Sequence, residues 1–152
     1  MSGSEREQRR RRLESSSAEE TEAEGARIAS ALHPGDVVVV SGELGAGKTT
    51  LIRGACRALG VEEPIVSPTF TIGRRYRGRM PISHLDLYRL AHLGEEEPGL
   101  LDDYLDDDTA AFVEWPAVAE PHLGGRTVVR VHLEHAGGDR RTIEVFGASM
   151  RK

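Results

Sequence analysis

The chain has little of what several large protein classes require. Its 152 residues are a natural length for one domain. A single cysteine, Cys56, excludes a disulfide within the chain and fits a reducing compartment. No apolar run approaches the roughly 20 residues of a membrane-spanning helix, and the N-terminus lacks a signal-peptide segment. The net charge of −5 gives no overall reason to expect nucleic-acid binding. We therefore expect a cytoplasmic protein that has no contact with a membrane.

Two polar residue types are also scarce. Asparagine is absent, and the one glutamine is Gln8. The Asn-Lys-x-Asp motif with which small GTPases read guanine is therefore missing, and so is a Ras-type catalytic glutamine. Lysine occurs only as Lys48 and Lys152, against 18 arginines, so a lysine at position 48 suggests a need for the smaller ammonium group. If the chain binds a nucleotide, these absences favour ATP over GTP.

What the chain does contain is a complete phosphate-binding loop, Gly42-Glu43-Leu44-Gly45-Ala46-Gly47-Lys48-Thr49. In such a loop the backbone N–H groups turn toward an anion, and the following helix adds the dipole of its N-terminus. We expect Lys48 to contact the β- and γ-phosphates and the Thr49 hydroxyl to bind Mg²⁺. Residues 36–41 are typical of a buried strand, and residues 48–59 of a helix that ends at Gly60. Strand, loop and helix thus follow in the order that this chemistry requires.

A phosphate loop also needs a nearby carboxylate to hold or position Mg²⁺. Two candidates follow strand-like apolar segments, Asp86 after residues 82–85 and Glu114 after residues 110–113. Both are expected at the carboxyl ends of strands, where open α/β sheets bind their ligands. We expect one of them to bind the metal directly. The other would bind it through water or orient the attacking water.

The rest of the chain fits one domain with a tail at each end. We expect residues 1–18 to be a disordered charged tail, residues 19–147 to be a single P-loop ATPase domain, and residues 148–152 to be a second tail. The order of strand-like and helix-like segments predicts an α/β fold. Its sheet should be mainly parallel and flanked by helices, with antiparallel edge strands.

Shorter segments and single residues carry further expectations. A helix is expected around residues 18–32, an extended segment at 65–72, a basic turn at 73–79, an acidic loop with a short helix at 93–108, strands at 81–87 and 109–115, and a hairpin from 127–133 and 141–146. We expect His84 to be packed or hydrogen-bonded rather than catalytic. Trp115 should lie either in the core or on the surface that binds a nucleotide or a partner.

Four segments, in this order, resemble the TsaE (YjeE) family of small bacterial P-loop ATPases. They are residues 42–50, Ser67-Pro68-Thr69-Phe70, His84-Leu85-Asp86-Leu87-Tyr88-Arg89-Leu90 and Glu114-Trp115-Pro116. The resemblance extends over residues 21–146, and the first 18 residues fall outside it.

The resemblance implies an ATP-binding and ATP-hydrolysing accessory protein in tRNA modification. Members of the family are required to form N6-threonylcarbamoyladenosine at position 37 of tRNAs that read ANN codons. They act with the TsaD and TsaB proteins, bind TsaD, and hydrolyse ATP so that the assembly turns over. The implied cofactors are ATP and Mg²⁺, and contact with tRNA is implied only through the TsaD–TsaB–TsaE assembly.

The resemblance also implies roles for single residues. The phosphates would be bound by Glu43, Leu44, Gly45, Ala46, Gly47, Lys48, Thr49 and Thr50. Lys48, Asp86 and Glu114 would be catalytic, with Thr49 and Glu114 on Mg²⁺ and Asp86 as the Walker-B-like acid beside it. Thr21 would contact the nucleotide, as would an arginine near the final hairpin, either Arg140 or Arg141. Within the switch-like residues 67–70, Thr69 would sense the γ-phosphate.

We expect hydrolysis to be slow and to depend on a partner, because no motif supplies an arginine finger, although Arg89 is a candidate. ATP is expected to order residues 67–79, and hydrolysis to release them. Two alternatives remain open from the residues alone. A small-molecule kinase would use the arginines of residues 73–79 as a lid over a second substrate, and a binding module would hold ATP only as a structural ligand.

Overall fold

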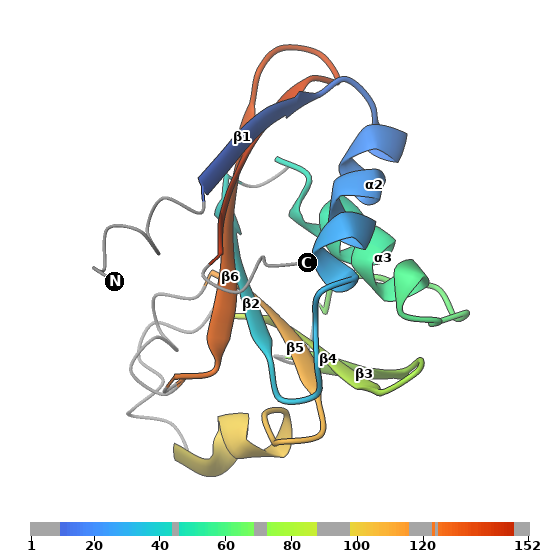
Figure 1. The fold of residues 1–152 in the computed structure, drawn as a ribbon, viewed down its shortest axis with the longest axis vertical. Coiled ribbons are helices and arrows are strands. Elements are labelled where there is room, and N and C mark those ends of the chain that lie inside the picture. Colours follow the sequence, from blue (N-terminus) through green and yellow to red (C-terminus); the bar gives the residue numbers. More distant parts are fainter. Residues whose placement is uncertain are drawn as a thin grey trace.

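Seven strands form one sheet in the computed structural model, which describes residues 10–43, 46–68, 73–87, 98–115, 123 and 125–147 (Figure 1). The sheet order is β1-β7-β6-β2-β5-β4-β3. In chain order the elements are β1 (Arg10–Ser15), α2 (Ala18–Ala29), β2 (Val37–Gly42), α3 (Lys48–Ala58), β3 (Gly73–Arg77), β4 (Pro81–Asp86), the 3₁₀ helix η2 (Pro98–Asp103), β5 (Ala110–Glu114), β6 (Thr127–His135) and β7 (Arg141–Gly147).

The centre of the sheet is parallel and its edges are antiparallel. β2 pairs in parallel with β5 and β6, and β4 pairs in parallel with β5. β3 runs antiparallel to β4, β7 to β6, and β1 to β7. The predicted α/β fold, with a mainly parallel sheet and antiparallel edge strands, is therefore confirmed. The four consecutive valines of β2, residues 37–40, explain its central place, since all four are buried and a parallel strand is covered on both faces.

Both α-helices cover the same face of the sheet (Figure 1). On that face Val38, Val40 and Phe112 pack with residues of α2 and α3 in the larger apolar cluster. On the opposite face Val37 and Val39 belong to a smaller cluster with Leu101 of η2 and Leu105, which follows that helix. The alternation along β2 thus divides its side chains between two cores, as the pleat of a strand requires.

The two helices touch through glycines. A Cβ atom on Gly25 of α2 would lie 2.0 Å from the backbone oxygen of Leu51 in α3, and one on Gly54 of α3 would lie 2.0 Å from the backbone oxygen of Glu22 in α2. No larger residue fits at either position, since real Cβ contacts lie well above 3 Å. The backbones of α2 and α3 are therefore in direct contact.

The N-terminal segment is more ordered than the sequence predicted. Residues 10–15 form β1, which pairs with β7 in continuous register, so the predicted disordered tail of residues 1–18 is wrong from residue 10 onward. Three side chains fix the strand. Arg11 pairs with the buried Glu24 at 2.5 Å, Leu13 packs against the larger apolar cluster, and the Ser15 hydroxyl lies 2.6 Å from that of Thr21. Long-range contacts, rather than local propensity, order this segment.

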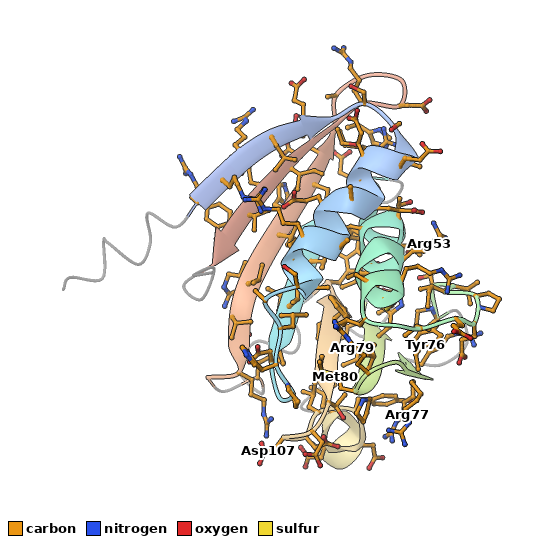
Figure 2. All side chains as sticks on the ribbon, turned by 45° about the vertical axis from the view of Figure 1, so that its right-hand side comes forward. Arg53, Tyr76, Arg77, Arg79, Met80 and Asp107 are labelled. Atoms are coloured by element: carbon orange, nitrogen blue, oxygen red, sulfur yellow. The ribbon has the colours of Figure 1, made fainter. Side chains whose placement is uncertain are left out.

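The predicted basic turn at residues 73–79 is also wrong, because residues 73–77 form β3 and only the following residues turn. Tyr76 is the buried anchor of this edge strand, and its hydroxyl donates to the backbone oxygen of Val66. Tyr76, Arg77 and Arg79 lie around the β3–β4 hairpin, at the end of the molecule away from β1 (Figure 2). The strand is ordered by its antiparallel pairing with β4, which the arginine-rich sequence concealed.

Other expectations agree with the structure or fall outside the part that it describes. The helices, the strands at β2, β4 and β5 and the β6–β7 hairpin lie where predicted, within a few residues at their ends. Residues 65–68 are neither helix nor strand, and residues 69–72 are not among the described residues. The same holds for residues 1–9 and for the predicted tail at 148–152. None of the described helices is long and apolar enough to cross a membrane.

The docking of β1 predicts a measurable loss of stability. Arg11→Ala should lower the free energy of unfolding by about 1–3 kcal/mol, because it leaves the buried Glu24 carboxylate unpaired. Urea denaturation measures the change. The control is Arg12→Ala, which removes an exposed pair with Glu144 and should change the free energy by less than about 0.5 kcal/mol. Equal stability of the two variants would contradict the docking of β1 on α2.

Candidate functional site

A cavity of about 280 Å³ lies where the ends of β4 and β5 meet the start of α3. The parallel register sets Asp86 beside Glu114 and Glu114 beside Val40, so three strands deliver their carboxyl ends to one place. Residues 47–50 form one wall, and the two carboxylates form another. The remaining lining residues are Ser67, Trp115 and Arg141.

The phosphate loop ends in a helix whose N-terminus has no side-chain cap. α3 begins at Lys48 after Gly47, which has a φ of 102°, a left-handed conformation that favours glycine. No side chain caps its first turn, and no acidic residue lies there, in contrast to α2, which Ser17 caps. The free N–H groups and the helix dipole make this end an anion-binding position. Leu44 and Gly45 of the predicted loop are outside the described residues.

Lys48 is buried beneath this loop. It is 5% exposed, and its Nζ donates to the backbone oxygens of Gly42 at 2.8 Å and Glu43 at 2.9 Å. The same ammonium lies 4.6 Å from the centre of the Trp115 ring. Burial lowers the pKa of Lys48, and the charges of Glu114 and Asp86 oppose that shift. The ammonium is thus held by two backbone carbonyls and an aromatic face, within the electrostatic influence of two carboxylates.

The two carboxylates have different surroundings. Glu114 is buried, and its Oε2 lies 2.6 Å from Nε2 of His84, which is fully buried. Asp86 is half-buried, and its Oδ2 accepts a hydrogen bond from the Ser67 hydroxyl at 3.2 Å. His84 is therefore both packed and hydrogen-bonded, the two roles that the sequence predicted for it.

The donors at the cavity suit a hard cation. The hydroxyl of Thr49 lines it together with the carboxylates of Asp86 and Glu114. Mg²⁺ is usually held by one or two carboxylates together with substrate phosphates and water, so this incomplete set of oxygen donors fits it. Among the described residues no three His, Cys, Asp or Glu side chains gather as a self-sufficient metal site. The residues fit Mg²⁺ delivered with a nucleotide better than a resident transition metal.

The three residues predicted to contact the nucleotide outside the loop lie at different positions relative to the cavity. Arg141 lines the cavity, and its Nε would lie 3.7 Å from a Cβ atom on Gly47. Arg140 is exposed in the hairpin turn and is not among the lining residues. Thr21 is buried, and its methyl group would lie 3.9 Å from the same Cβ position on Gly47, so it stands beside the loop without lining the cavity.

The remaining predicted site residues differ in their positions relative to the cavity. Thr50 lines the cavity, Ala46 is buried in the larger core, and Glu43 is exposed. Trp115 is half-buried and lines the cavity, so of its two predicted positions the core is wrong, and a contact with a nucleotide or a partner stays a prediction. Thr69 and Arg89 lie outside the described residues.

The sequence did not single out Ser15, whose hydroxyl supports Thr21 from β1. The alternation of Arg11, Leu13 and Ser15 on one face was the available signal, and the adjacent arginines concealed it.

Comparisons with known proteins agree on one family. The sequence model described as "Threonylcarbamoyl adenosine biosynthesis protein TsaE" matches residues 15–143. A tRNA threonylcarbamoyladenosine biosynthesis protein TsaE from Bacillus subtilis is 38% identical over 126 residues, which cover 82% of this chain and 78% of the relative. The protein of the same name from Streptomyces coelicolor is 45% identical over 118 residues, which cover 76% of this chain and 79% of the relative.

A solved structure supports the same assignment. The crystal structure of YdiB from Bacillus subtilis superposes with a TM-score of 0.75 at 31% sequence identity, and the match covers 91% of this chain and 86% of that one. The family model spans the loop, both carboxylates and the first residues of β7, so the chain belongs to the TsaE family of threonylcarbamoyl adenosine biosynthesis proteins.

Proposed function

We propose that this chain is a Mg²⁺-dependent ATPase that is required to form N6-threonylcarbamoyladenosine at position 37 of tRNAs reading ANN codons. It would act in the cytoplasm with TsaD and TsaB, and meet tRNA only through that assembly. The observation that carries the proposal is the buried Lys48 ammonium at the uncapped start of α3, which the loop carbonyls hold in a cavity that Asp86 and Glu114 also line.

Each group has a separate task in this proposal. The N–H groups at the start of α3 bind phosphate oxygens, and Lys48 neutralises charge on the transferring phosphoryl group. Thr49, Glu114 and Asp86 hold Mg²⁺, which supplies further positive charge to the phosphate oxygens when it is bound. Arg141 reaches the nucleotide from the start of β7. These groups bind and orient ATP, whereas efficient ATP hydrolysis requires the TsaD–TsaB pair.

The segment that ATP could order is shorter than the residues 67–79 expected from the sequence. The expectation that ATP orders residues 67–79 is too broad, since residues 73–77 already lie in the sheet as β3. Ser67 joins the segment to the site through its hydrogen bond to Asp86. A nucleotide-dependent change would therefore concern the stretch from Ser67 to the start of β3.

The first test is Mg²⁺-dependent ATP hydrolysis by the purified protein, alone and with the TsaD–TsaB pair of its own organism. We expect slow hydrolysis alone and a clear stimulation by the pair, because the described cavity has only Arg141 to act as a cationic finger. ATP consumption only after a nucleoside or sugar is added would instead favour a small-molecule kinase. Tight ATP binding without hydrolysis, even with the pair present, would favour a structural role for ATP.

Substitution of Lys48 tests the site directly. Lys48→Ala should lower stimulated hydrolysis by about 100-fold or more, because the ammonium that neutralises phosphate charge is lost. Lys48→Arg keeps the charge but brings a larger planar group into a cavity built around an ammonium, and should also impair hydrolysis. Normal hydrolysis by Lys48→Ala protein, with its fold verified by circular dichroism, would remove the loop from the reaction.

The two neighbouring arginines provide a matched pair of variants. Arg141→Ala should weaken ATP binding about tenfold or more, the usual effect of losing one charge-assisted hydrogen bond. Arg140→Ala carries the same change in net charge one residue away, outside the cavity, and should bind ATP within about twofold of the wild type. Fluorescence titration with a labelled nucleotide measures both affinities. Equal weakening by both variants would point to overall charge rather than to a contact from Arg141.

A further inference from the structure

His84 is a buried polar residue that the proposed function leaves without a task. It lies on β4 between Ile82 and Asp86 on the face covered by the helices, and it is 0% exposed. Its register partner on β5 is Phe112, and Glu114 lies two residues further along that strand on the same face. Residues diagonal to one another on neighbouring strands are within reach of long side chains. The position thus brings one imidazole nitrogen against the Glu114 carboxylate.

Among the described residues the ring of His84 makes one hydrogen bond. Its Nε2 lies 2.6 Å from Oε2 of Glu114, while its buried Nδ1 has no hydrogen-bond partner in that part of the chain. The carboxylate oxygen accepts in this bond, so Nε2 carries a proton, and in a neutral ring with that proton Nδ1 is bare. A buried nitrogen without a partner costs free energy, and an apolar ring would fill the same space without that cost. The bond to Glu114 is therefore what the imidazole contributes to this core.

The hydrogen bond from His84 determines which oxygen of Glu114 is available to a ligand in the cavity. The carboxylate is 3% exposed, so a rotation within the core would leave it without solvent to compensate. Because Oε2 accepts from His84, Oε1 is the oxygen left for a cation or a water in the cavity that Glu114 lines. Hydrogen bonds from a neighbouring group to a ligating carboxylate fix its orientation and tune its affinity for metal.

We propose that His84 is a positioning residue, which holds the Glu114 carboxylate by its Nε2–H so that the other oxygen faces the Mg²⁺ and phosphate position beside Lys48 and Thr49. The inference rests on the proposed function for the identity of the cation and the nucleotide. The hydrogen bond joins two side chains of the chain itself, so its existence does not depend on the identity of either ligand.

Two amide substitutions test the proposal, because they copy different ring nitrogens. The amide nitrogen of glutamine can take the place of Nε2, whereas that of asparagine takes the place of Nδ1, which has no partner. His84→Gln should therefore keep the half-saturating Mg²⁺ concentration for nucleotide binding or hydrolysis within about fivefold of the wild type. His84→Asn should raise it by about 10–100-fold, the usual effect of removing a partner of a metal ligand.

The control for a merely structural effect is Ser83→Ala. Ser83 is also buried on β4, but it faces the other side of the sheet and donates to the backbone oxygen of Tyr104 at 2.8 Å. Loss of this hydrogen bond should lower the midpoint of urea denaturation while leaving the half-saturating Mg²⁺ concentration within about twofold of the wild type. A Ser83→Ala protein with the Mg²⁺ requirement of His84→Asn would overturn the positioning role.

Measurements without nucleotide separate this inference from the proposed function. Nitrogen-15 NMR of the ring should show a protonated Nε2 and a bare Nδ1. The emission of Trp115, which follows Glu114 directly, should be altered by His84→Asn but not by His84→Gln. The opposite tautomer, or equal behaviour of the two variants, would overturn the role of His84. A wild-type protein that binds no ATP but passes both tests would contradict only the proposed function.

Discussion

The backbone contact between α2 and α3 is the constraint on which the candidate site depends. At Gly25 and at Gly54 a Cβ atom would fall 2.0 Å from a carbonyl oxygen of the other helix, well inside the van der Waals distance. An alanine at either position would push the helices apart by more than 1 Å. A displacement of about 1 Å in a catalytic group can lower a reaction rate by about 100-fold. Because α3 begins at Lys48 and α2 carries Thr21 in its first turns, the same contact sets the distance between Thr21 and the loop.

The parallel register of the central strands supplies the other half of the arrangement. β2, β4 and β5 all point their carboxyl ends toward the start of α3, and the register fixes Asp86 opposite Glu114. Parallel strands are covered on both faces, so a carboxylate at such a strand end is removed from bulk water by the fold itself. Glu114 is nearly as buried as the valines of β2 for this reason. The fold therefore creates a low-dielectric wall opposite a positive helix terminus.

The parts of the structure that depend on local patterns could be predicted from the sequence. The loop, its strand and helix, and the carboxylates at two strand ends follow from short motifs and apolar periodicity, and they meet in one cavity. β1 and β3 could not be predicted, because their arginine-rich sequences resemble a solvated tail and a turn. Pairing with β7 and β4 orders them, together with a few inward side chains such as Leu13 and Tyr76. Such contacts join residues far apart in the chain and leave no local signature.

The choice between Arg140 and Arg141 is an intermediate case. Arg141 shares its strand face with Ile143 and Val145, which belong to the core beneath the helices, so the period-2 alternation of β7 aims it toward the loop. That signal was present in the sequence. It became decisive only once the start of β7 was known, because a shift of one residue would have turned Arg140 inward instead.

The cluster of buried polar groups at the cavity is costly for the fold. Lys48, His84 and Glu114 are each at most 5% exposed, and burial already lowers the pKa of Lys48. Replacement of such a cluster by well-packed apolar side chains of similar volume is often neutral or stabilising in proteins, whereas removal of one member leaves a buried charge unpaired. A core optimised only for stability would therefore not keep a buried ammonium near a carboxylate that is itself hydrogen-bonded to a buried imidazole. Their presence together, in a small domain with little stability to spare, is best explained by the chemistry that they perform on a ligand in the cavity.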